Sequence, residues 1–187
     1  LTRQSRCGSH QKQGRRAAMI DLRSNLRLKE ILSETDRFPL GVELVSTRGT
    51  MTQKQTLKTR SFSEDLTHSP RVDWVSITDN AGGNPQLAPI ALGTPILFAG
   101  KEVIIHLTCK DLNRNGLESA AWRYAAEGFN NLLVLTGDLP ASGYGGVAKG
   151  VFDLDSCALV SLLNSMNSGL QVPGRKGDTE TLPKTDF

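Results

Sequence analysis

The sequence predicts an α/β fold, a (β/α)8 TIM barrel truncated to about its first four strand–helix units. Apolar segments rich in β-branched residues alternate four times with helical stretches, which is the pattern of a parallel sheet. Each apolar segment turns polar toward its end, where parallel α/β proteins bind ligands. No G-x-G-x-x-G motif follows the first strand and no G-x-x-x-x-G-K-S/T motif occurs, so the phosphate-binding signatures of a doubly wound sheet are missing.

Residues 1–20 are predicted to be a disordered or non-native leader. Within it, residues 1–18 hold five basic side chains and no acidic one, and the first methionine is Met19. A transit peptide is an alternative, although apolar periodicity is lacking. The formal net charge of +3 leaves 3 − 5 = −2 for the rest of the chain, which argues against nucleic acid as a partner.

The body of the chain, residues 21–187, begins with a predicted helix over 21–34, because leucine and isoleucine recur on one face. A short apolar strand follows over 42–45, and then a polar stretch with helical propensity around 53–58. A second strand is predicted over 74–78. The next residues hold two glycines and an Asn-Pro pair, which predict a loop over 79–85.

The middle of the body continues this alternation. Residues 87–98 are apolar and predicted to be partly helical, with Pro89 and Pro95 limiting the length of the helix. The β-branched segment 103–109 predicts a third strand, and 114–128 predicts a helix.

The last part of the body holds the fourth predicted strand, over 131–138. A glycine-rich loop over 139–150 separates it from a predicted helix over 153–167, whose leucines lie on one side. Residues 168–185 are polar, with glycines and prolines, and are predicted to be loop or disorder.

Composition limits the classes of protein that the chain can represent. Of its 187 residues, 38% are hydrophobic and 22% are charged, as in ordinary globular domains. No apolar run reaches the length of a membrane span, so none is predicted. The three cysteines include no C-x-x-C pair, which argues against a disulfide framework and a zinc site and favours the reducing cytoplasm.

Side-chain alternation predicts which residues face the inside of the barrel, because successive residues of a strand point to opposite faces. Each strand has one apolar set suited to contact with helices and a second set that becomes polar toward the strand end. The second set, predicted to face inward, consists of Glu43, Val45, Ser76, Thr78, His106, Thr108, Thr136 and Asp138. In a barrel these residues would approach the mouth, where reactions occur.

Two acidic residues are candidates for chemistry. Glu43 lies in an apolar strand, where burial would favour its protonated form, and this suits a general acid; a buried ion pair is the alternative. Asp138 follows Gly137, which permits close approach of a ligand, so its carboxylate could accept from a ligand N–H. A turn or helix-cap role before Pro140 is the alternative for Asp138.

Two further residues close the third predicted strand. His106 is a candidate proton donor or ligand contact, with a satisfied core histidine as the alternative. Cys109 is a candidate nucleophile, with a buried structural thiol as the alternative because no activating base is evident. The Gly82-Gly83 and Gly143-x-Gly145-Gly146 stretches are either phosphate-binding backbone or plain loops.

Four motifs together resemble one known family. The motifs are V-E-L-V-S-T-R-G (42–49), S-I-T-D-N-A-G-G (76–83), I-H-L-T-C (105–109) and L-V-L-T-G-D-L-P (133–140). In their order and spacing they resemble methylenetetrahydrofolate reductase. The resemblance covers about residues 38–187. It implies a (β/α)8 barrel that holds FAD, takes hydride from NAD(P)H and reduces 5,10-methylenetetrahydrofolate to 5-methyltetrahydrofolate in one-carbon and methionine metabolism.

The resemblance also implies roles for single residues. By position, Glu43 resembles the general acid of the family, and Asp138 resembles the acid beside the flavin and pterin rings. The implied flavin contacts are Thr78, His106, Leu135, Thr136, Gly137 and Asp138. Because Leu135 lies outside the predicted inward set, we expect it to contact the flavin through its backbone or at the rim. No metal ligand is implied.

The sequence also departs from the common family pattern. Asp79 stands where the family has an aromatic residue, Thr136 stands where it has an arginine, and the K-D-L-N-R-N form at 110–115 resembles a divergent branch. These differences leave the electron donor open between NAD(P)H and a redox partner protein. The full-length protein is expected to form a homo-oligomer.

Two alternatives to a reductase remain open. One is a non-catalytic half-barrel fragment, in which the edge strands 42–45 and 131–138 would lie unpaired. The other is a barrel methyltransferase that binds a folate without flavin.

Overall fold

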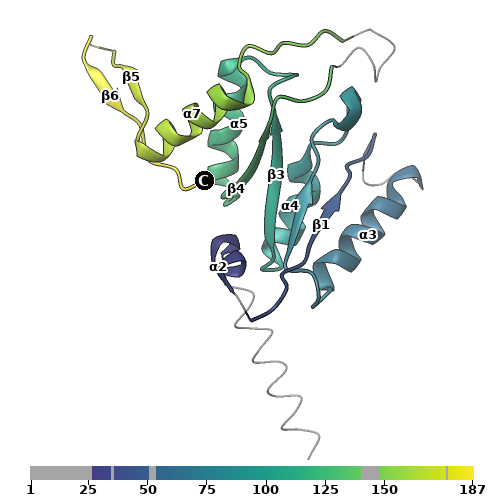
Figure 1. Cartoon of the computed structure of the whole chain (residues 1–187). Helices are drawn as coiled ribbons and strands as arrows, with labels where there is room; N and C mark the ends of the chain where they lie inside the picture. Colours follow the sequence, from purple (N-terminus) through teal and green to yellow (C-terminus); the bar gives the residue numbers. More distant parts are fainter. Residues whose placement is uncertain (1–26, 35, 51–53, 140–147, 176) are drawn as a thin grey trace, which may run out of the picture.

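The structure is a computed structural model that describes residues 27–34, 36–50, 54–139, 148–175 and 177–187. The predicted leader at 1–20 and the start of the helix predicted over 21–34 lie outside these residues. The rest of that helix is α2, Leu28–Ser33, in which Leu28 and Ile31 are buried. The backbone N–H of Leu28 donates to Glu102 Oε2 (3.1 Å), which holds α2 near the amino ends of the strands (Figure 1).

Four parallel strands form the central sheet, in the order β1-β2-β3-β4. Their bounds are Gly41–Leu44, Trp74–Ile77, Glu102–Thr108 and Asn131–Leu135. Neighbours in the sheet are neighbours in the sequence, so the order never reverses as it does in a doubly wound sheet. The predicted α/β class is confirmed, and the sequential parallel sheet is compatible with part of a (β/α)8 barrel.

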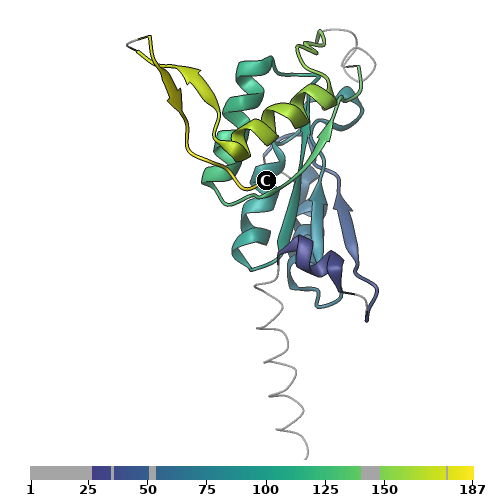
Figure 2. The same cartoon turned by 60° about the vertical axis from the view of Figure 1, so that its left-hand side comes forward.

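Helices cover one face of this sheet (Figures 1 and 2). They are α3 (Leu57–His68), α4 (Pro89–Phe98), α5 (Arg114–Ala126) and α7 (Ser156–Ser168). The sheet side chains beneath them are at most 1% exposed: Leu44, Val75, Ile77, Val103, Ile105 and Leu107. Helix residues such as Ile96, Leu117 and Leu159 complete the same core. The apolar set of the first three strands therefore faces helices, as predicted.

Two helices begin at caps that the sequence provides. Asn113 Oδ1 accepts from the backbone N–H of Gly116 at the start of α5 (2.9 Å), and Asp155 Oδ1 accepts from that of Ala158 at the start of α7 (2.7 Å). In α4, Pro95 lies inside the helix and does not end it. Burial of its neighbours against the sheet offsets the hydrogen bond that proline cannot make.

The polar segment at the chain's end differs from its prediction of loop or disorder over 168–185. It contains an antiparallel hairpin of β5 (Gln171–Pro173) and β6 (Thr179–Thr181). The turn is closed by a backbone hydrogen bond from Gly174 N to Asp178 O (2.8 Å), and Gly177 has a φ of +80°. The polar composition predicted loop because it offers no apolar pattern. The hairpin is instead formed by backbone pairing and a glycine turn, which do not require apolar burial.

Candidate ligand-binding site at the carboxyl ends of the strands

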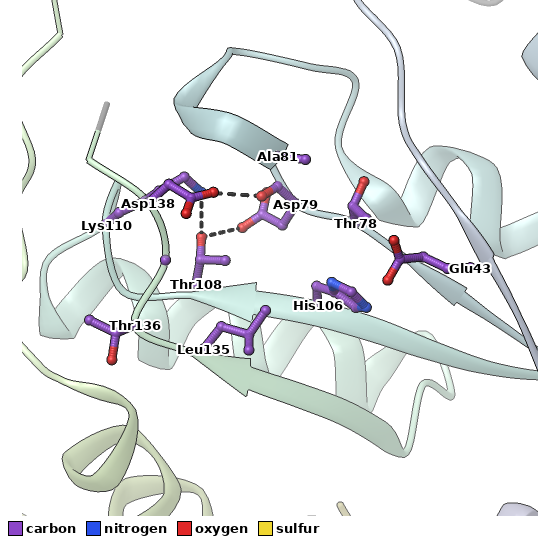
Figure 3. A pocket seen from close by; sticks show the side chains of 11 residues that line it. Glu43, Thr78, Asp79, Ala81, His106, Thr108, Lys110, Leu135, Thr136 and Asp138 are labelled. Carbon is purple, nitrogen blue, oxygen red and sulfur yellow. Dashed lines mark hydrogen bonds between the residues drawn. The ribbon is translucent and has the colours of Figure 1, made fainter. Parts of the chain in front are cut away.

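A pocket of about 410 Å³ opens where the strands end (Figure 3). It is lined by Glu43, Thr78, Asp79, Ala81, His106, Thr108, Lys110, Leu135, Thr136, Gly137 and Asp138. All the residues to which the family resemblance assigns a catalytic or cofactor-binding role are in this set. Its volume falls in the range of about 300–1,000 Å³ that is usual for small-molecule sites.

Strand register decides which side chains face the pocket. Glu43 pairs with Ser76, and Ser76 with Ile104, so these residues share the face opposite the helices. His106 and Thr108 lie on the same face two and four residues further along β3. The strand residues Glu43, Ser76, His106 and Thr108 of the predicted inward set therefore lie on the face opposite the helices.

On β4 the predicted facing of the side chains is wrong. Thr108 pairs with Leu135, so Leu135 points to the pocket side and Thr136 to the opposite side. The Thr136 hydroxyl accepts from the backbone N–H of Ser156 (3.3 Å) at the start of α7 and points away from the other lining residues (Figure 3). The prediction took the polar set as the inward one, but β4 ends at Leu135, before that set begins.

Glu43 is exposed on β1, so its predicted burial is wrong. The strand is at the edge of the sheet, and no described residue covers its open face at this point. Figure 3 shows the Glu43 carboxylate turned toward the ring of His106. The side chain therefore faces the pocket as expected, but without the desolvated setting that its apolar neighbours indicated.

His106 is 5% exposed, and its Nε2 lies 2.7 Å from Ser76 Oγ. Burial lowers the pKa of His106, against the opposing effects of the Glu43 and Asp79 carboxylates. The ring is therefore held in its neutral form near pH 7. It has a hydrogen-bond partner, as the core-histidine alternative requires, and it also lines the pocket, as a ligand contact requires.

Asp138 reaches the pocket because the chain turns sharply after β4. Gly137 has a φ of +90°, a conformation that favours glycine. Asp138 Oδ2 then accepts from the backbone N–H of Gly82 (3.1 Å), which belongs to the loop after β2. The local turn or helix-cap role is not what the structure shows, since this partner is 56 residues away in the sequence.

A buried cation, Lys110, lies just after the carboxyl end of β3, and the sequence analysis did not predict it as a site residue. Lys110 is 1% exposed, and its Nζ donates to Thr108 Oγ1 (2.8 Å) and to the backbone oxygen of Asp79 (3.1 Å). It also forms an ion pair with Asp111 Oδ2 (3.2 Å). Thr108 Oγ1 in turn lies 2.8 Å from Asp79 Oδ2. The available signal was a lysine directly after an apolar strand, which is weak because such lysines are usually solvated.

The remaining candidates do not add chemistry to the pocket. Cys109 is fully buried, and burial raises the pKa of its thiol, as expected for a structural cysteine. Gly82 and Gly83 have positive φ values in the short 3-10 helix η2 (Ala81–Gly83), whereas the Gly143–Gly146 stretch lies outside the described residues. Within the residues that the structure describes, no cluster of metal-binding side chains and no helix able to span a membrane is found.

Fold and site together define an α/β protein with an acidic ligand pocket at the carboxyl ends of a parallel sheet. The pocket combines the carboxyl groups of Glu43, Asp79 and Asp138 with a neutral imidazole and an apolar leucine. A family model described as methylenetetrahydrofolate reductase matches residues 35–172, and the chain belongs to that family. No match to a curated protein was found for the chain.

Proposed function

We propose that this chain binds FAD in the pocket and serves the reduction of 5,10-methylenetetrahydrofolate to 5-methyltetrahydrofolate. The observation that supports this most is the convergence of Glu43, Thr78, His106, Gly137 and Asp138 on one pocket in a chain of this family. A folate reductase needs polar groups that orient its ring systems, and the pocket offers several of them beside the apolar side chains of Leu135 and Ala81.

The residues present fit a flavin ring. Leu135 offers an apolar side chain on the pocket side, and Gly137 also lines the pocket. Thr78 and the neutral His106 are buried polar groups at the same wall. Bound FAD would supply the hydride-transfer chemistry, while the protein binds, orients and tunes it.

Two carboxyl groups have separate roles in this proposal. Glu43, which faces the pocket from β1, holds the proton that passes to the folate nitrogen as the C–N bond to the methylene carbon breaks. Asp138, at the pocket rim, places a negative charge beside the bound rings. That charge disfavours electron-rich forms of the ring system and so sets how readily it accepts electrons.

The test follows the two half-reactions on the protein incubated with FAD. Free FAD is removed by gel filtration, bound flavin is measured by visible absorbance, and the flavin is reduced anaerobically and then exposed to 5,10-methylenetetrahydrofolate. Reoxidation with formation of 5-methyltetrahydrofolate is expected. A folded protein that binds folate but no flavin would favour the methyltransferase alternative, and one that binds neither would favour a non-catalytic fragment.

The same absorbance measurement of bound flavin also identifies the electron donor. Reduction by NADH or NADPH is expected if a nicotinamide serves as donor, and reduction by dithionite alone would indicate a redox partner protein. The cytoplasmic location and the homo-oligomeric state remain predictions, which fractionation of cells and sedimentation analysis would test.

A further inference from the structure

The loop after β2 is closed over residues 80–86 by hydrogen bonds between its two ends. Asn80 Oδ1 accepts from the backbone N–H of Gln86 (2.8 Å), and Gln86 Oε1 accepts from the backbone N–H of Ala81 (3.3 Å). Each of these two side chains thus satisfies a backbone donor at the opposite end of the loop. Asn80 has a φ of 46° and a ψ of 48°, a left-handed conformation that asparagine adopts more readily than most residues. The loop is therefore held in one shape by its own side chains.

The amide group of Asn80 also attaches this loop to the loop after β3. Asn80 Nδ2 donates to Asp111 Oδ2 (2.9 Å), which in turn forms an ion pair with the buried Lys110 (3.2 Å). The two partners fix the orientation of the amide, because the Gln86 N–H needs an acceptor and the Asp111 carboxylate needs a donor. A single side chain, that of Asn80, therefore both closes the loop after β2 and connects it to the loop after β3.

The closed loop carries the hydrogen-bond partner of Asp138. Gly82, two residues after Asn80, donates its backbone N–H to Asp138 Oδ2 (3.1 Å). Asp138 lies at the end of the pocket away from Glu43 (Figure 3). A hydrogen bond from an N–H group to a carboxylate is strong and directional. The position of the Gly82 N–H, which the shape of the loop determines, therefore determines where the Asp138 carboxylate stands.

We propose that Asn80 is a positioning residue for Asp138, because its side chain fixes the loop whose Gly82 N–H holds the Asp138 carboxylate at the pocket wall. This inference rests on the proposed function, in which the charge of Asp138 sets how readily the bound flavin accepts electrons. Asn80 is not among the residues that line the pocket, so it acts through Gly82. Without its side chain the loop loses its bonds to Gln86 and Asp111. The carboxylate of Asp138 then turns toward water, where a charge is most stable.

The test compares the flavin potential of four forms of the FAD-loaded protein, namely the unaltered protein, Asn80→Gly, Asp138→Asn and the double variant. Glycine suits the left-handed conformation, so Asn80→Gly removes the amide group without straining the backbone. We expect the potential of Asn80→Gly to rise in the same direction as that of Asp138→Asn but by less, because the charge is displaced and not removed. In the double variant, Asn80→Gly should add nothing to the shift that Asp138→Asn causes. Such non-additivity is expected of two residues that act as one unit.

A second readout needs no flavin. The NMR chemical shift of the Gly82 amide proton should change in Asp138→Asn, where a neutral acceptor replaces a charged one. We expect this change to be largely lost when Asp138→Asn is made in the Asn80→Gly background. Asn164→Ala, which removes an exposed amide group on α7, is the control and should alter neither the potential nor the Gly82 signal. Circular dichroism and the urea midpoint of each variant establish that the compared proteins are folded.

Two results would overturn this inference alone. One is a normal potential in Asn80→Gly beside a raised potential in Asp138→Asn. The other is an equal effect of Asn80→Gly in the presence and in the absence of the Asp138 carboxylate. An unchanged potential in Asp138→Asn would instead overturn the tuning role of Asp138, on which the inference rests. A folded protein that binds no FAD would overturn the proposed function, and the Gly82 signal would then still support or overturn the positioning of Asp138 by Asn80.

Discussion

Gly137 lies so close to Lys110 that a Cβ atom at this glycine would be 3.0 Å from Lys110 Cδ and 3.2 Å from Thr108 Cβ. The loop after β4 therefore rests directly on the buried lysine of the loop after β3. This contact needs both the positive φ of Gly137 and its missing side chain. It joins the pocket wall to the hydrogen-bond chain that holds Asp79.

Substitution of Gly137 should therefore lower the free energy of unfolding for two separate reasons. Gly137→Ala is expected to destabilise it by about 1–3 kcal/mol through the positive φ, with a further loss because the Lys110 stem must shift. Urea denaturation measures the total. Gly177→Ala is the matched control, since Gly177 also has a positive φ, +80°, but no atom of the described residues lies within 4 Å of its added Cβ. Equal losses in both variants would contradict a role for the Lys110 contact.

Alternation along the strands explains what the sequence could predict of the site. The neighbours of Glu43, Thr78 and His106 are apolar and face the helices, so these three side chains lie on the opposite face. This alternation with a period of two can be recognised from the sequence alone. Asp138 is a candidate because it follows Gly137 at the end of the fourth predicted strand. These inferences needed only local pattern.

The failures have a different cause, which is contact between segments distant in the sequence. Alternation does not tell where β4 ends, so Leu135 and Thr136 were assigned to the wrong faces. The chain from Lys110 to Asp79 joins the exits of two strands, and neither residue has an unusual local setting in the sequence. The exposure of Glu43 follows from the edge position of β1, which the sequence predicts only for the half-barrel alternative.

The buried state of His106 predicts a change of stability with pH. Its pKa is lowered from 6.5, so the unfolded chain takes up a proton that the folded protein refuses. The free energy of unfolding should therefore fall as pH drops below about 6.5 toward the lower pKa of the folded state. His106→Gln removes this contribution and should flatten the dependence, as measured by urea denaturation at about pH 5 and about pH 7.5.

The control for this prediction is the exposed histidine at the end of α3. His68→Gln should keep the full dependence of the unaltered protein, because His68 lies at the surface. Other groups titrate in the same range, so the quantity to compare is the difference between variant and unaltered protein at each pH. An identical slope for His106→Gln and the unaltered protein would rule out His106 as the source.

The proposed acid role of Glu43 predicts a selective loss of one half-reaction. Glu43→Gln keeps the shape of the side chain but cannot donate a proton, so reduction of bound flavin should remain within about twofold of normal. Its reoxidation by 5,10-methylenetetrahydrofolate should slow by about 100-fold or more, the usual scale of general acid catalysis. Stopped-flow absorbance follows both steps. A parallel loss in the two half-reactions would contradict the role.

Asp138 should tune the bound flavin through its charge. Asp138→Asn removes a negative charge at the rim while keeping an oxygen that can accept from Gly82 N–H. Since reduction adds negative charge, loss of the carboxylate should raise the flavin potential, measured by equilibration with a reference dye. Glu180→Gln, an exposed position on β6, is the control and should leave the potential unchanged. An unaltered potential in Asp138→Asn would argue against tuning by this residue.

Removal of the buried Lys110 should lower the free energy of unfolding, because this side chain connects the loops that follow β2 and β3. Lys110→Met keeps an apolar stem beneath Gly137 but removes the donor to Thr108 Oγ1 and to the Asp79 backbone oxygen. Asp111 loses its ion pair but still accepts from Asn80 Nδ2. Groups deprived of buried partners in this way cost about 3 kcal/mol in total, which urea denaturation would detect. Lys149→Met, at an exposed position, should change the free energy of unfolding by less than about 0.5 kcal/mol. Similar stability of the two variants would mean that the ammonium group of Lys110 does not hold the exits together. A loss confined to Lys110→Met, accompanied by weaker FAD binding, would connect this cation to the shape of the pocket.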